Sequence, residues 1–266
     1  MRTIIKRFQH PTLQIFLTPL ATIFFGILVS ARDATIIHWG NVGLLYVIAF
    51  AAHILNHFLT IKYNRMNREA ANVGFWIIIE AILLGASIFF MLRHGWALNI
   101  LLVLYLLSTH LLYFPHNISL TGYRIFLSSF FQGFILNVIA YSSISTMIPK
   151  SILKAFIPLV IIQLIVNYQI THLEKRSQDP NIAPLIGVRR LMVLIGLLLS
   201  IGTGVYFSIP THSFYLLQIL FVILSVFVLV PVLIPTDNSR QIQNKINYLN
   251  AITAIYSILY TISYLY

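Results

Sequence analysis

Two short segments of this chain share one pattern of polar residues. Each reads Asn-x-x-x-Thr-x-x-x-x-Arg, first over residues 56–65 and again over residues 167–176. In a helix, the Asn and the Thr four residues later share a face, and the next turn carries the basic residues. Two such stripes could face each other across a cavity that binds a polar or anionic group. The alternative is two ordinary helix ends, where Asn and Thr act as caps and Arg marks a membrane surface.

Further basic residues lie close to these segments in the sequence. They could hold a diphosphate or a lipid head group directly, because charge-assisted hydrogen bonds from Lys and Arg need no metal. The alternative is that these cations only set the topology of the chain and contact anionic lipids. The candidates are Lys62, Arg68, Arg124, Arg189 and Arg190.

Histidines provide the candidate metal ligands. His53 and His57 have the i, i+4 spacing that can bind a metal from one helix face, and His110, His116 and His172 could lie nearby. Since no carboxylate accompanies this pair and no His-Glu-x-x-His pattern occurs, we interpret the pair as polar lining of a cavity and expect no metal site.

The composition of the chain is that of a membrane protein. The 266 residues are 59% hydrophobic and 9% charged, which excludes an ordinary soluble surface. The net charge of +11 would suggest nucleic acid as the partner of a soluble protein, but here we expect membrane lipid and no nucleic acid. The absence of cysteine excludes disulfides, thiolate metal sites and a cysteine nucleophile.

Uncharged runs of about 20 residues predict the helices that must position the polar groups. Nine runs predict an all-α, polytopic helical bundle that forms a single transmembrane domain over residues 1–266. The third run contains the acid Glu80, which must be neutral, paired or functional at that depth. The expected spans are 11–31, 41–61, 72–92, 96–115, 125–148, 155–173, 191–210, 213–235 and 247–266.

The basic residues predict the orientation of this bundle. With nine spans, 13 of the 17 Lys and Arg residues fall on the side of the N-terminus. By the positive-inside rule the N-terminus is cytoplasmic and the C-terminus external, so function is expected on the cytoplasmic face. Only four cations lie opposite: Arg32, Arg93, Lys150 and Lys154.

The placement of the two motifs resembles the UbiA-type intramembrane prenyltransferases, which are nine-helix proteins. That family carries an Asn-Asp-x-x-Asp-x-x-x-Asp motif after its second span and a related motif after its sixth, and these acids hold Mg²⁺ on an isoprenyl diphosphate. Here the Asn of the motif falls on Asn56 and Asn167, and the basic residue after it on Arg65 and Arg176. The acids are replaced by His57, Thr60 and Asn64 in the first copy and by Tyr168, Thr171 and Lys175 in the second.

Two loops extend the resemblance over nearly the whole chain. Residues 112–124 are similar to the family's Tyr-Ser-x-Pro-Pro-x-Arg-Leu-Lys-x-Arg-Gly loop, although Ser119 and Thr121 stand at basic positions. Residues 184–190 are similar to its Leu-Pro-x-x-x-Gly turn before the seventh span.

The missing acids decide what the resemblance implies. Mg²⁺ prefers carboxylate and phosphate oxygens, and only Glu69, Glu174 and Asp179 lie near the expected cytoplasmic mouth. We therefore expect no cofactor; Mg²⁺ would be expected only if the site were not degenerate. We also expect a degenerate, non-catalytic protein that binds a polyprenyl diphosphate, another isoprenoid or a quinone. An active prenyltransferase in which Lys175 and its neighbours replace Mg²⁺, and a transport or structural subunit, are the alternatives. The expected location is a bacterial plasma membrane.

Overall fold

The computed structural model describes residues 11–34, 36–64, 73–145, 147–179, 181–209, 215–229, 233–234 and 239–266. Within these ranges every regular element is helical, and no strand occurs. The elements are α2 (Pro11–Asp33), α3 (Trp39–Asn64), α4 (Val73–Met91), α5 (Trp96–Leu111), α6 (Gly122–Phe130), the π-helical turn η2 (Phe131–Ile135), α7 (Leu136–Ser142), α8 (Lys150–Ala155), α9 (Ile157–Gln178), α10 (Val188–Ser208), α11 (Leu216–Leu229) and α12 (Ser239–Leu265).

The structure is a helical membrane bundle, as the uncharged runs predict. In the described part of the chain, six helices are long and apolar enough to cross a bilayer, counting α6 to α7 and α8 to α9 as one each. The others in this set are α2, α3, α4 and α10. Helices α5 and α11 are apolar but shorter, and α12 is long but more polar. Each of the nine expected spans overlaps a described helix, whereas crossing by all nine stays a prediction.

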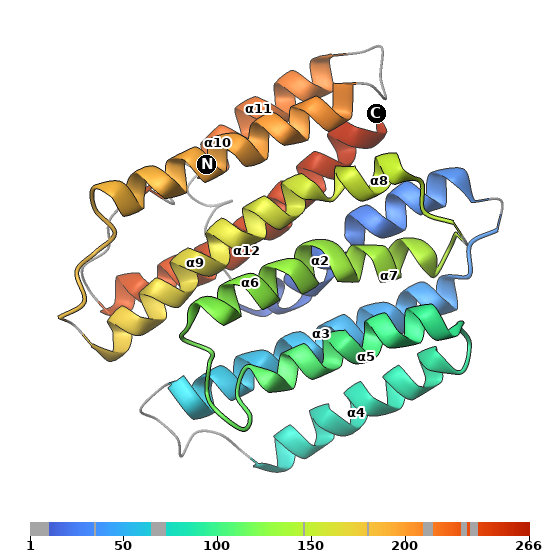
Figure 1. The fold of residues 1–266 in the computed structure, drawn as a ribbon, viewed down its shortest axis with the longest axis horizontal. Helices are drawn as coiled ribbons and strands as arrows, with labels where there is room; N and C mark the ends of the chain where they lie inside the picture. The colour runs from blue at the N-terminus through green and yellow to red at the C-terminus, as the bar shows by residue number, and fades with distance from the viewer. Residues whose placement is uncertain are drawn as a thin grey trace.

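The bundle has two hydrophobic cores that meet at α2 and α7 (Figure 1). One core joins these helices to α8 through α12, and the other joins them to α3, α4 and α5. Helix α2 contributes Phe25 and Val29 to the first core and Ile23 and Ile27 to the second. An apolar helix that is covered on opposite faces in this way lies at the centre of a bundle.

Several helices extend further than the uncharged runs predict. The sixth expected span, 155–173, is part of a helical segment that runs from Lys150 to Gln178 with a break at Phe156. Pro158 accounts for the break, because proline in the first turn of α9 has no N–H to donate to the preceding turn. Helix α12 begins at Ser239, eight residues before the expected span, so several polar residues become part of a regular helix.

Glycines allow two close helix contacts at the centre. The Gly26 N–H of α2 donates to Asn137 Oδ1 of α7 at 3.0 Å, and a Cβ on Gly26 would lie 2.3 Å from the Asn137 carbonyl oxygen. In η2, a Cβ on Gly133 would lie 2.8 Å from Val160 Cα of α9. Small residues at such positions let helix backbones approach each other inside a membrane.

We expect Gly26→Ala to destabilise the bundle, because the added methyl group would meet the backbone of α7 and not a flexible side chain. Overpacking of this kind costs about 1–3 kcal/mol. The midpoint of thermal unfolding in mild detergent measures the effect. Gly85→Ala is the matched control, since a Cβ there meets nothing within 4 Å. Equal unfolding midpoints for the two variants would contradict the close contact between α2 and α7.

Candidate functional site

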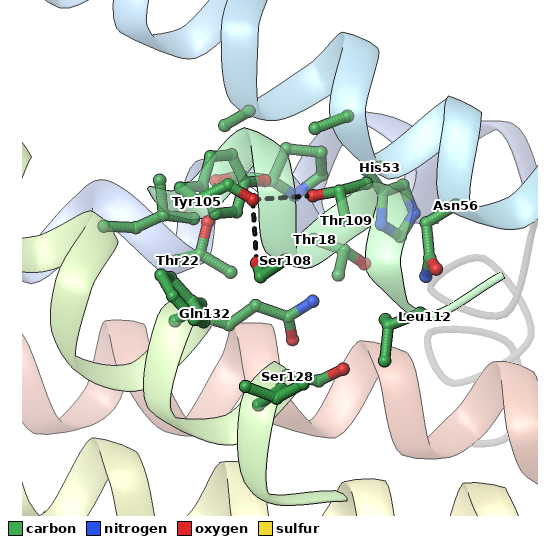
Figure 2. Close-up of a pocket in the computed structure, with 16 residues that line it drawn as sticks. Thr18, Thr22, His53, Asn56, Tyr105, Ser108, Thr109, Leu112, Ser128 and Gln132 are labelled. Atoms are coloured by element: carbon green, nitrogen blue, oxygen red, sulfur yellow. Dashed lines mark hydrogen bonds between the residues drawn. The ribbon is translucent and has the colours of Figure 1, made fainter. Parts of the chain in front are cut away.

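A polar cavity of about 80 Å³ lies where α2, α3, α6, η2, α9 and α12 meet. A second compartment of about 40 Å³ adjoins it and shares four lining residues: Thr18, His53, Asn56 and Gln132. Figure 2 shows this compartment, where the hydroxyl groups of Ser108 and Thr109 donate to the backbone carbonyl of Tyr105. We name the two compartments together the central cavity.

Both motif segments contribute to the central cavity. Asn56, His57 and Thr60 line it from α3, and Asn167 lines it from α9. The structure therefore brings together the two stripes that the sequence pattern singles out, while their ligand-binding role stays a prediction.

Hydrogen bonds fix the lining polar groups of α3 and α9. The Tyr113 hydroxyl donates to Asn56 Oδ1 at 2.8 Å and lies 2.7 Å from Thr60 Oγ1. On the other side, Asn167 Nδ2 donates to Ser129 Oγ at 3.1 Å. These polar groups are held in place before any ligand enters.

A buried ion pair is part of the cavity lining. Arg124 of α6 contacts Glu174 of α9 through both guanidinium Nη atoms, with Nη2 at 3.3 Å from Oε1. Their side chains are 7% and 12% exposed, and Arg124 Nη1 also donates to the Ser119 carbonyl at 3.1 Å. Arg124 is the only Lys or Arg among the described lining residues, and Glu174 already compensates its charge.

The Asn64 side chain forms hydrogen bonds with the loop before α6 and does not line the cavity. Its Oδ1 accepts hydrogen bonds from Asn117 Nδ2 and Ser119 Oγ, both at 3.0 Å. Its carbonyl accepts from Gln178 Nε2 at the end of α9. Asn64 and Ser119 stand where the UbiA-type pattern has an Asp and a basic residue, and here they join three helix ends.

The remaining candidates within the described part of the chain do not line the central cavity. Lys62 Nζ lies 4.8 Å from the ring centre of Trp76 on α4, and Tyr168 packs against the hydrophobic core. Thr171 is buried, with no hydrogen-bond partner for its hydroxyl. Lys175, Arg189 and Arg190 are exposed, and Arg176 and Arg190 line a second pocket beside α9. Arg65 and Arg68 lie outside the described residues.

The lining of the central cavity does not fit Mg²⁺. Glu174 is the only carboxylate among the described lining residues, and it is held by Arg124. No group of three or more His, Asp or Glu side chains in the described part of the chain could hold a metal ion. His53 and His57 line the same cavity, and the described lining holds no second carboxylate to complete a metal site with them. The amides, hydroxyls and imidazoles of the lining can form hydrogen bonds, but they do not supply the anionic oxygens that Mg²⁺ prefers.

The intramembrane acid Glu80 is paired. His110 Nε2 of α5 lies 2.8 Å from Glu80 Oε1 of α4, and His110 Nδ1 lies 2.8 Å from the Leu106 carbonyl. An acid at that depth must be neutral, paired or functional, and the structure shows a paired acid whose hydrogen bond joins α4 to α5.

Helix α12 presents a polar face to the cavity, and no residue of this face was among the predicted site residues. Its residues recur every three or four positions, a spacing that places them on one helix face, and this period was readable in the sequence. Two glutamines of η2 and α9 were missed as well. The additional lining residues are Gln132, Gln163, Gln243, Asn247, Asn250 and Thr253.

Comparison with protein families, with curated proteins and with solved structures finds no match for this chain. The resemblance to the UbiA-type enzymes therefore rests on the motif positions and loops described above.

We expect Glu174→Gln to destabilise the protein strongly, because it leaves the buried Arg124 charge without compensation. Breaking a buried pair in this way costs about 3–5 kcal/mol. The double variant Arg124→Gln/Glu174→Gln removes both charges and should recover part of the loss in thermal unfolding experiments. Lys175→Gln, an exposed neighbour on α9, is the control and should change little. A Glu174→Gln protein as stable as this control would contradict the importance of the pair.

Proposed function

We propose that this protein is a non-catalytic, UbiA-like membrane protein with nine spans that binds the head group of an isoprenoid or quinone-type lipid in its central cavity. One observation carries the proposal. Polar residues at the two matched motif segments line the same cavity, where the family would place its ligand.

The charges of the lining favour a neutral head group. A diphosphate carries several negative charges, and the one guanidinium in the described lining is already neutralised by Glu174. Amide N–H and hydroxyl groups donate well to carbonyl oxygens such as those of a quinone. A ligand that forms hydrogen bonds with the lining groups of a buried polar cavity gains binding energy from them. We therefore favour a prenylated quinone over a prenyl diphosphate.

The same lining argues against prenyl transfer. Ionisation of a prenyl diphosphate requires stabilisation of the leaving group's charge, as metal ions provide in the family that this chain resembles. The cations proposed as substitutes do not line the central cavity: Lys175 is exposed, and Arg176 lines the pocket on another face of α9.

The proposed orientation places the cavity toward the cytoplasm. It lies near the ends of α3 and α9 and the starts of α6 and α12, which meet at one end of the bundle (Figure 1). These are the helix ends that the positive-inside rule assigns to the cytoplasmic face.

Binding of a short-tailed prenylated quinone to the purified protein tests the proposal. We expect Asn250→Leu to weaken this binding about fivefold, because loss of one hydrogen bond costs roughly 1 kcal/mol. Asn244→Leu is the matched control, since Asn244 is an exposed residue of the same helix that does not line the cavity. Equal affinities of the two variants would contradict binding in the cavity.

Geranylgeranyl diphosphate is the competing ligand in the same assay, with Mg²⁺ and then with EDTA. We expect weaker binding than for the quinone and no product in either condition. Mg²⁺-dependent binding with formation of a prenylated product would show instead that the protein is an active transferase. Failure of both ligands to bind would favour a transport or structural role.

A further inference from the structure

A second pocket of about 30 Å³ lies between α9, α10 and the start of α12. Helix α9 separates it from the central cavity: Asn167, Ile170 and Glu174 face the cavity, whereas Gln169 and His172 face this pocket. The two sites therefore use different faces of one helix. We name this site the α9/α10 pocket.

Three cations from three helices line the α9/α10 pocket, namely Arg176 of α9, Arg190 of α10 and Lys245 of α12. Its described lining contains no carboxylate. Lys245 precedes the expected span 247–266, and burial together with the neighbouring charge of Arg190 lowers its pKa to about 8. The positive charges of Lys245 and Arg190 thus repel each other across this pocket, and an anion between them would reduce this repulsion.

One buried nitrogen of α9 points to the same kind of ligand. Gln169 is 1% exposed, and its Nε2 has no hydrogen-bond partner. A buried donor without an acceptor is costly, and an amide nitrogen can only donate. Gln169 Nε2 therefore lacks an acceptor, and the described lining of the pocket lacks a negative charge.

The start of α10 adds to the positive potential. This 21-residue helix begins at Val188, after Gly187 in a positive-φ conformation (φ 56°). The first N–H groups of a helix and its macrodipole attract anions. Leu173, Leu185 and Val193 complete the pocket with apolar surface, against which the chain of a lipid can pack.

We propose that the α9/α10 pocket binds a phosphate group, supplied either by the head group of an anionic lipid or by free phosphate. Phosphate offers negative charge to Arg190 and Lys245 and an acceptor oxygen to Gln169. Lys245 Nζ already donates to the Ile234 carbonyl, and an ammonium group has further N–H groups for a ligand. The site is separate from the central cavity, so the inference does not depend on what that cavity binds.

Binding of lipids to the delipidated full-length protein tests whether the phosphate group comes from a lipid head group. Native mass spectrometry of the protein in detergent compares phosphatidic acid, which has a phosphate monoester, with zwitterionic phosphatidylcholine. A thermal shift with sodium phosphate, against sodium chloride of equal ionic strength, tests free phosphate. We expect phosphatidic acid or phosphate to bind, and Arg190→Gln to weaken that binding about tenfold, because it removes a charge-assisted contact.

Arg189→Gln is the matched control, since it changes the net charge equally at the adjacent exposed residue that does not line the pocket. A second variant, Gln169→Leu, should weaken binding severalfold without lowering the unfolding midpoint, because it removes an unpaired buried donor. Binding of the lipid alone assigns the site to a head group, and stabilisation by phosphate alone assigns it to the free ion. Equal losses for Arg189→Gln and Arg190→Gln, or no binding of either source, would overturn the proposal.

Discussion

The contact between Arg124 and Glu174 joins the parts of the structure that surround the central cavity. Charges taken out of water persist only when they are paired and hydrogen-bonded, and both side chains here are almost completely buried. The pair fixes the start of α6 to the end of α9. Through the Ser119 carbonyl and the side chain of Asn64, it also connects both helices to the end of α3. The ends of α3 and α9 and the start of α6 are thus held by one continuous polar network.

Helix α9 separates two environments of opposite electrostatic character. Toward α3 and α12 its side chains border a cavity of amides and hydroxyls in which the one ion pair is internally neutral. Toward α10 its side chains border a pocket that contains three cations and the unpaired amide donor of Gln169. The proposed neutral head group matches the internally neutral lining of the first, and the proposed phosphate supplies the negative charge and the acceptor that the second lacks. In both proposals the ligand contacts the same helix.

Local sequence signals located most of the helices but misplaced several of their ends. Uncharged runs identify the parts of a helix inside the hydrocarbon, whereas the helix continues wherever backbone hydrogen bonds remain satisfied. Helices α9 and α12 consequently extend beyond their apolar runs, and their extensions carry Glu174 and Gln243. The polar period of α12 could have been recognised from sequence. The π-helical turn that contains Gln132 follows no comparable pattern, and the close approach of Gly133 to α9 became visible only in the folded bundle.

The sequence by itself determined that this chain is a helical membrane protein, where its apolar segments lie, and that two of them carry matching polar stripes. These properties depend on composition and on periods of three to four residues, which are local. Only the tertiary structure decided which polar residues share a site. It placed Asn56 and Asn167 at one cavity, paired Arg124 with a residue 50 positions away, and placed Arg176 and Arg190 at another pocket. Such pairings depend on which helix faces pack together, and that is fixed by the close fit of whole helices and not by the period of any single one.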